Sequence, residues 1–190
     1  MNEIEREKRV ISMMITMHSI LKNRYRFLSS VFENTLLIAS TFLTACALLD
    51  HALISRMTGL SEDSLKFIIG VAAVVVFAIS IVLIQVKWKE KADEHARAAE
   101  QLFILQQQCR EILSMKDGKE KDDAGKEFSG KYVQILNIIC KIPDRKFNSL
   151  KLKHYRKVEL SKMIDKNPGS RLIILKLKLF LSSFKAGQNS

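Results

Sequence analysis

The chain contains 190 residues with a formal net charge of +11, and 47% of its residues are hydrophobic while 27% are charged. A mean hydropathy of +0.03 is high for so charged a chain, and it requires apolar and charged residues to lie in separate segments. The length excludes a large multidomain enzyme, and the composition excludes a disordered or disulfide-stapled chain. We therefore expect a small, basic, all-α membrane protein.

The first predicted element is a cytoplasmic helix over residues 1–30. Its apolar residues recur at alternating spacings of three and four, which is typical of a helix that packs against another helix. This stripe comprises Ile4, Ile11, Met14, His18, Leu21, Tyr25 and Leu28.

A first transmembrane helix is predicted over residues 31–54. Between Phe32 and Leu49 the only charged residue is Glu33, at the edge of the run. With its flanking residues the run is long enough to cross a hydrocarbon core of about 30 Å. The alternative is a buried helix that accompanies a single membrane span.

The same helix carries a polar stripe. At 100° per residue, Ala47 and four polar residues lie within about 40° of one line along the helix. When several copies assemble, such a stripe is suited to line a water-filled pore. The alternative is that its hydroxyl groups bond to a neighbouring helix. The predicted pore-lining residues are Glu33, Ser40, Thr44 and His51.

A second transmembrane helix is predicted over residues 66–87, after an extracytoplasmic connection over residues 55–65. Phe67 to Val86 are twenty uncharged residues, enough to span the bilayer core. Basic residues are frequent before the first span and directly after the second, whereas the connection contains only Arg56. The positive-inside rule therefore predicts that both termini are cytoplasmic.

A cytoplasmic helix is predicted over residues 88–116, with a second stripe at spacings of three and four. The two stripes predict a helical hairpin that extends the membrane helices into the cytoplasm. His18, His95 and Cys109 lie on the stripes, and we expect them to pack or hydrogen-bond between helices rather than to bind metal. The three cysteines show no zinc-type spacing and predict no disulfide. The second stripe comprises Trp88, Ala92, His95, Ala99, Leu102, Gln106, Cys109 and Leu113.

Residues 117–126 combine two glycines with dense mixed charge and predict a linker. Residues 127–190 predict a basic C-terminal helical region. Within it, one helix ends before Pro143, and Asp144 is expected to cap a second helix that ends at about Lys166. The tail over residues 171–190 fits either a strand or a helix in the membrane interface, and the helix is favoured.

Nearly all of the net positive charge lies near the C-terminus, where Lys141 to Lys185 contain thirteen Lys and Arg against three acidic residues. This segment is suited to bind an anionic lipid surface, a nucleotide or nucleic acid. The lipid surface is favoured, and no specific nucleic acid is expected. The candidate binding residues are Arg145, Lys146, Lys151, Lys153, His154, Arg156 and Lys157.

No enzyme signature is present in the sequence. It contains no phosphate-binding glycine loop, no zinc-spaced Cys and His set and no nucleophile elbow. We therefore expect no catalytic residues, no resident cofactor and no metal.

Two segments carry a resemblance to a known family. They are WKEKADEHARAAEQLFILQQQCREIL, which follows the second span, and IPDRKFNSLKLKHYRKVELSKMIDKNPG. With the two spans before them, they resemble the SLATT family of two-transmembrane effector domains from prokaryotic conflict systems. The resemblance covers nearly the whole chain, except the last fifteen or so residues, and it implies no catalytic site. Family members are associated with nucleotide second-messenger synthases or sensors, and they are thought to disrupt membranes by forming pores.

The expected function is therefore a pore-forming or membrane-disrupting effector of bacterial antiphage defence in the inner membrane. Its expected partners are the lipid bilayer, further copies of the chain, and a nucleotide second messenger or an operon-encoded sensor or synthase. Several copies are required because one pair of spans cannot enclose a pore. The alternatives are a non-conducting scaffold that anchors a cytoplasmic partner, and a small housekeeping transporter.

Overall fold

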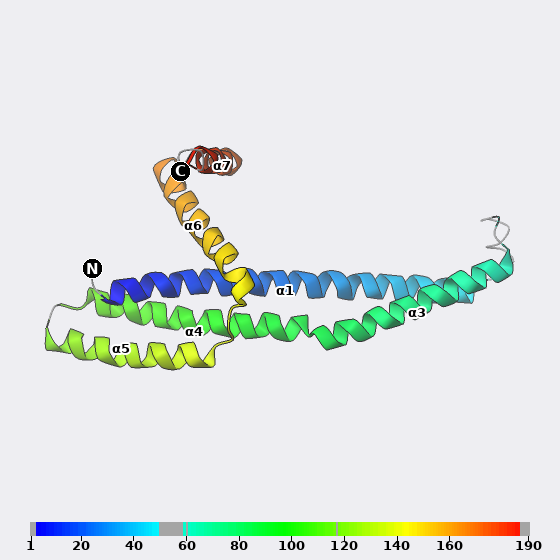
Figure 1. Cartoon of the computed structure of the whole chain (residues 1–190), viewed down its shortest axis with the longest axis horizontal. Helices are drawn as coiled ribbons and strands as arrows, with labels where there is room; N and C mark the ends of the chain where they lie inside the picture. Colours follow the sequence, from blue (N-terminus) through cyan, green and yellow to red (C-terminus); the bar gives the residue numbers. More distant parts are fainter. Residues whose placement is uncertain (1–2, 50–58, 60, 117, 187–190) are drawn as a thin grey trace. The chain divides into compact units, whose positions relative to one another are not determined.

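The computed structural model describes residues 3–49, 59, 61–116 and 118–186, with side chains up to residue 179. Every regular element in these residues is an α-helix, which confirms the all-α prediction for them. The helices fall into two compact units: a head unit, which contains residues up to Ile20 and from His95 onward, and a hairpin unit, Leu21–Glu94. The helices are α1 (Glu3–Leu48), α3 (Glu62–Val86), α4 (Trp88–Ser114), α5 (Lys119–Ile138), α6 (Asp144–Lys166) and α7 (Leu172–Ala186) (Figure 1).

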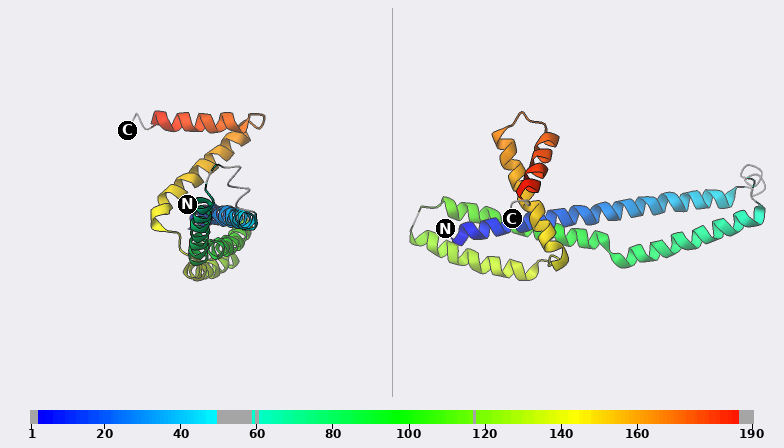
Figure 2. Two further views of the ribbon diagram at one scale, coloured as in Figure 1. Left: turned by 90° about the vertical axis from the view of Figure 1, so that its right-hand side faces the viewer. Right: turned by 45° about the horizontal axis from the view of Figure 1, so that its top comes forward.

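In the hairpin unit, α3 runs beside the second half of α1 (Figure 2). The start of α3 is fixed by Ser61, whose hydroxyl oxygen accepts a hydrogen bond of 3.3 Å from the backbone N–H of Ser64. Helix α3 ends where Lys87 adopts a left-handed conformation with φ 52° and ψ 43°. Because this residue interrupts the helix, α4 begins as a separate helix at Trp88. The rings of Phe32 and Trp88 then contact each other, with centroids 4.8 Å apart.

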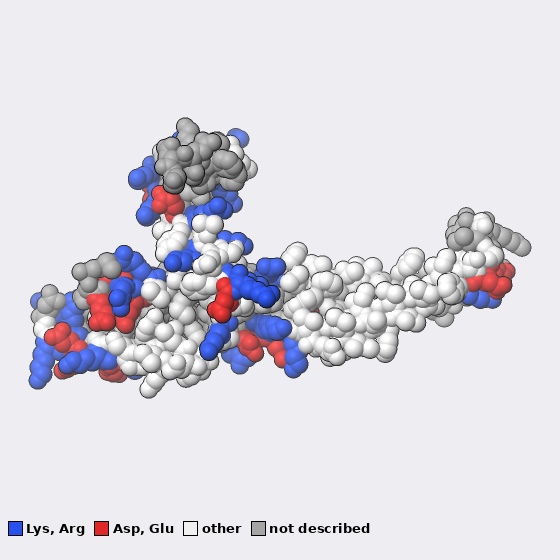
Figure 3. Space-filling view, viewed as in Figure 1, with Lys and Arg blue, Asp and Glu red and all other residues white. Residues whose placement is uncertain are grey.

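The hairpin unit exposes its apolar side chains. In both α1 and α3, an 18-residue window that is long and apolar enough to cross a membrane has no buried residue. Ile38 and Phe77, for example, are 69% and 66% exposed. On the face drawn in Figure 3, Lys, Arg, Asp and Glu are missing from a long stretch of these two helices. By length and composition, the described residues thus contain two candidate membrane spans.

The head unit has an apolar core in which the start of α1, α4 and α5 lie side by side (Figures 1 and 2). Ile11, Leu102 and Cys109 of the predicted stripes are fully buried there. On α4, however, Leu105 and Ile112 are buried beside the predicted stripe, because this helix packs against two neighbours and buries a wider face.

The prediction of a linker over residues 117–126 is wrong for most of that segment, since α5 begins at Lys119. Acidic residues in the first turn stabilise its N-terminus through the helix dipole. Gly125 lies inside the helix, and a Cβ added there would meet the Cδ1 of Ile4 at 3.4 Å. Ala124 and Phe128 of α5 pack in the core of the head unit, and this packing offsets the weak helix propensity of the stretch.

Helix α6 begins one residue earlier than predicted, at Asp144 rather than after it, so the prediction that Asp144 caps the helix is wrong. Pro143 occupies the cap position with no side-chain hydrogen bond, and Asp144 is the first helical residue. The proline fits because a helix start needs no N–H there. The tail forms helix α7, so the strand alternative is wrong for Leu172–Ala186.

Candidate functional site

Three side chains that the sequence places far apart meet in the head unit. His18 comes from α1, His95 from α4, and Cys140 from the connection that follows α5. The Nδ1 atoms of the two histidines are 3.0 Å apart, and the Sγ of Cys140 lies 3.1 Å from Nδ1 of His95 and 3.9 Å from Nδ1 of His18. We call these three residues the His–His–Cys cluster.

The cluster is shielded from solvent. His18 has no exposed surface and His95 is 6% exposed, while Cys140 is half-buried. Burial, and secondarily the charge of a protonated His95, lower the pKa of His18 to about 4, so its ring is neutral at pH 7. Among the described residues, the Nε2 of His18 is buried without a hydrogen-bond partner.

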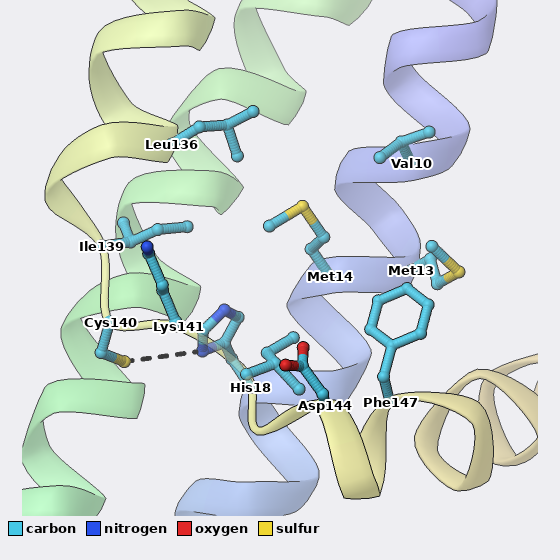
Figure 4. Close-up of a pocket in the computed structure, with 11 residues that line it drawn as sticks. Val10, Met13, Met14, His18, Leu136, Ile139, Cys140, Lys141, Asp144 and Phe147 are labelled. Carbon is cyan, nitrogen blue, oxygen red and sulfur yellow. Dashed lines mark hydrogen bonds between the residues drawn. The ribbon is translucent and has the colours of Figure 1, made fainter.

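A cavity of about 340 Å³ lies beside the cluster. His18 and Cys140 contribute to its wall, together with the charged side chains of Lys141 and Asp144 and the ring of Phe147 (Figure 4). The cavity therefore offers both apolar and charged groups next to two members of the cluster. The remaining wall is formed by Val10, Met13, Met14, Leu136, Ile139 and Ile142.

Cys109 has a different environment from Cys140. It is fully buried in the core, and burial, with a smaller contribution from Glu7, raises the pKa of its thiol to about 11. A thiol of this kind remains protonated and acts as a small apolar side chain. Cys109 thus packs in the apolar core, whereas Cys140 lies in the polar His–His–Cys cluster.

The predicted basic binding residues differ in their exposure. His154 is buried, and its Nδ1 donates to the hydroxyl oxygen of Thr16 at 3.0 Å, since that hydroxyl donates to the carbonyl of Ser12. Burial and, to a smaller extent, the charge of Lys157 lower the pKa of His154. His154 therefore joins α6 to α1. The other candidates are Arg145, Lys146, Lys151, Lys153, Arg156 and Lys157, of which Lys146 and Lys151 are half-buried and the rest are exposed.

A second cavity of about 340 Å³ lies between α6 and α7. It brings together three of the predicted candidates, Lys153, Arg156 and Lys157, and adds Lys176 from α7. Leu160 and Leu179 supply apolar wall. Four cations around a partly apolar cavity are suited to an anion that also has an apolar part.

The polar stripe of the hairpin unit has its hydroxyl donors satisfied within α1. The hydroxyl of Ser40 donates to the carbonyl of Leu37 at 3.0 Å, and that of Thr44 donates to the carbonyl of Ser40 at 2.8 Å. Glu33 accepts a hydrogen bond of 2.6 Å from Ser29, one turn earlier. His51 lies outside the described residues.

Comparison of the chain with protein-family models, curated proteins and solved structures found no match. The residues themselves therefore carry the functional argument. His18 and His95 lie on the two predicted helical stripes, and the expected packing of these stripes against each other is the sequence signal that predicts their proximity. The sequence contains no signal for Cys140, which lies on neither stripe and follows the end of α5.

Proposed function

We propose that this chain is a membrane-inserted effector of the SLATT type, which forms an ion-conducting pore in the bacterial inner membrane as part of antiphage defence. Both termini and the head unit lie in the cytoplasm, and several copies assemble around the pore. A cytoplasmic signal controls the opening. This proposal combines the resemblance to SLATT domains with three features of the described residues.

The exposure of apolar side chains along α1 and α3 carries the proposal. Neither 18-residue apolar window has a buried residue. Leaving one large apolar side chain in water forgoes about 1.5–3 kcal/mol relative to burial, so a water-exposed hairpin of this kind would be strongly disfavoured. A bilayer covers both helices at once. The positive-inside rule then favours a cytoplasmic location for the head unit.

The polar stripe of α1 is the part of the hairpin unit that we assign to the pore wall. The hydroxyl groups of Ser40 and Thr44 donate their hydrogen bonds to carbonyls of their own helix. Ser80 of α3 does the same, since its hydroxyl donates to the carbonyl of Phe77 at 2.7 Å. These groups therefore need no partner on a neighbouring helix, and their oxygen lone pairs remain able to accept from water. Such a surface suits the wall of a hydrated pore.

The basic cavity between α6 and α7 is the proposed receiver of the signal. Its four cations suit the phosphates of a nucleotide second messenger, and its two leucines suit an apolar part of the same ligand. A ligand changes the assembly only by binding the open and closed states with different affinity. The cavity joins two helices, so it changes shape whenever they move.

The test is the membrane potential of bacteria that express the full chain with its activating genes, measured with a voltage-sensitive dye. Wild type depolarises the cells. The double variant Ser40→Leu/Thr44→Leu does not, because leucines block the hydrated path. Thr41→Leu is the matched control, since its hydroxyl also donates within the helix, to Leu37 at 2.8 Å. Thr41 lies off the stripe, about 100° from Ser40 and about 60° from Thr44 around α1.

Each variant is compared at equal abundance in the membrane fraction. If the double variant depolarises cells as well as Thr41→Leu does, the stripe does not line a pore. If wild type leaves the potential unchanged with every stimulus, the pore function is wrong.

The alternative function is a non-conducting scaffold. It is favoured by large apolar side chains that the head unit leaves exposed, such as Ile104 at 54% on α4 and Val133 at 56% on α5. These side chains suit a protein partner. A scaffold predicts an unchanged membrane potential and a partner recovered in stoichiometric amount with the full chain.

A further inference from the structure

The His–His–Cys cluster has the composition of a transition-metal site. We propose that His18, His95 and Cys140 bind one zinc ion in the head unit. This proposal does not depend on the pore function, and it departs from the expectation that the histidines only pack or hydrogen-bond between helices.

The distances between the three ligand atoms fit tetrahedral zinc. With Zn–N bonds of about 2.05 Å and Zn–S bonds of about 2.3 Å, tetrahedral angles place two nitrogens about 3.3 Å apart and a nitrogen and a sulfur about 3.6 Å apart. The corresponding separations here are 3.0 Å for the two nitrogens, and 3.1 and 3.9 Å for nitrogen and sulfur. All three lie within about 0.5 Å of the tetrahedral values.

Hydrogen bonding alone does not account for this arrangement. The Nδ1 of His95 has two close neighbours, Nδ1 of His18 and Sγ of Cys140. A ring nitrogen offers one proton or one lone pair, so it forms only one well-directed hydrogen bond. A metal ion between the three atoms satisfies all of them at once, with both rings neutral and the thiol proton released to solvent.

The orientation of His18 directs Nδ1, rather than Nε2, toward the other two ligand atoms. Its Nε2 is buried without a partner in the described part of the chain, and an unpaired buried polar atom costs about 1–3 kcal/mol. The ring accepts this cost while it directs Nδ1 toward His95 and Cys140. The stabilising contact of this side chain is therefore the one made by Nδ1.

The ligand set favours zinc over the common hard cations. Imidazole and thiolate ligands select borderline and soft metals, whereas magnesium and calcium prefer oxygen ligands. Three protein ligands leave the fourth zinc position open, and the adjoining cavity provides room for a water molecule or an external ligand. Asp144 lies in the same cavity wall, and its carboxylate is a candidate partner of a bound water.

Zinc at this position would join three elements of the head unit: α1, α4 and the connection between α5 and α6. These segments are up to 122 residues apart in the sequence. A metal that binds only the folded arrangement stabilises it in proportion to its affinity and concentration. The expected role of the zinc ion is therefore structural.

The test uses the full chain, expressed in zinc-supplemented medium with an affinity tag that lacks histidine, and purified in detergent. Zinc is measured by mass spectrometry after dialysis against metal-free buffer. Wild type retains one zinc ion per chain. His95→Gln and Cys140→Ser lower the zinc affinity by more than about tenfold. Loss of a residue that only hydrogen-bonds to a metal ligand already lowers affinity by at least about tenfold, and loss of the ligand itself lowers it further.

Two matched variants control for the loss of a buried side chain of the same type. Cys109→Ser removes a buried thiol of the core, and His154→Gln removes a buried, hydrogen-bonded imidazole outside the cluster. Both retain zinc as wild type does. Replacement of zinc by Co²⁺ in wild type also gives a thiolate-to-cobalt charge-transfer band, which does not depend on how well the variants fold.

The proposal is overturned if wild type holds no more zinc than His95→Gln and Cys140→Ser. It is equally overturned if the cobalt-loaded wild type shows no charge-transfer band.

Discussion

Replacing Gly125 with alanine tests the helical structure of a segment whose composition predicts a linker. Gly125 lies in the interior of α5, and Ala is favoured over Gly there by about 0.8–1 kcal/mol. The added Cβ meets the Cδ1 of Ile4 at 3.4 Å, an ordinary contact that adds apolar burial without a clash. We therefore expect Gly125→Ala to raise the free energy of unfolding by about 1 kcal/mol. For a chain of this size, that corresponds to a rise in Tm of about 2–4 °C.

The assay is thermal unfolding of the full chain in nanodiscs, followed by far-UV circular dichroism. Gly130→Ala is the matched control, since Gly130 lies in the same helix and an added Cβ there meets nothing within 4 Å. Gly130→Ala therefore gains stability from helix propensity alone, without a new side-chain contact. If Gly130→Ala raises Tm while Gly125→Ala leaves it unchanged or lowers it, the helix does not extend over residue 125 and the linker prediction stands.

Three further predictions concern the head unit. Leu102→Ala lowers the free energy of unfolding by about 2–5 kcal/mol in chemical denaturation, because its side chain has no exposed surface in the core. Thr16→Val and His154→Gln show a coupling energy of about 1 kcal/mol in a double-mutant cycle, because a hydrogen bond of 3.0 Å joins the two side chains. Lys157→Glu weakens the binding of inorganic pyrophosphate about tenfold in calorimetry, because it replaces one of four cations around the cavity by an anion.

For each of these three predictions, a control variant or a specific outcome would contradict it. Ile104→Ala, at an exposed position of α4, changes stability by no more than about 0.5 kcal/mol, so an equal loss for Leu102→Ala would exclude the assigned core. Additive effects of Thr16→Val and His154→Gln would show that the two side chains do not interact. Lys119→Glu, at the exposed start of α5, should leave pyrophosphate binding unchanged, and an equal effect would indicate nonspecific charge.

The helices of this chain were predictable where one physical signal dominated. A run such as Phe67 to Val86 has no charge and no strong helix breaker, so length and hydropathy define α3 almost completely. The pairing of α1 with α4 followed from periodicity. The start of α5 was missed because its stability comes from packing such as that of Ala124 and Phe128 in the core, and tertiary packing of this kind leaves no local signal.

The candidate sites were less predictable than the fold. His18 and His95 lay on facing stripes, but the approach of Cys140 depends on where the chain turns after α5. His154 was grouped with the basic residues because of its neighbours in the sequence. In the structure it faces α1 instead, since one helix turn carries exposed and buried positions side by side.

The central claim is that one face of α1 lines a pore, and the most direct measurement of it is cysteine accessibility in reconstituted bilayers. Ser40→Cys, Thr44→Cys and Thr41→Cys are made one at a time in a Cys46→Ser background, and the conductance of the activated full chain is recorded before and after a charged thiol reagent. The background itself, which retains Cys109 and Cys140, is the reagent control. The account predicts that the reagent blocks conductance through the cysteines at 40 and 44 and leaves the one at 41 unaffected. Equal block at all three positions, or no conductance in any of them, would contradict it.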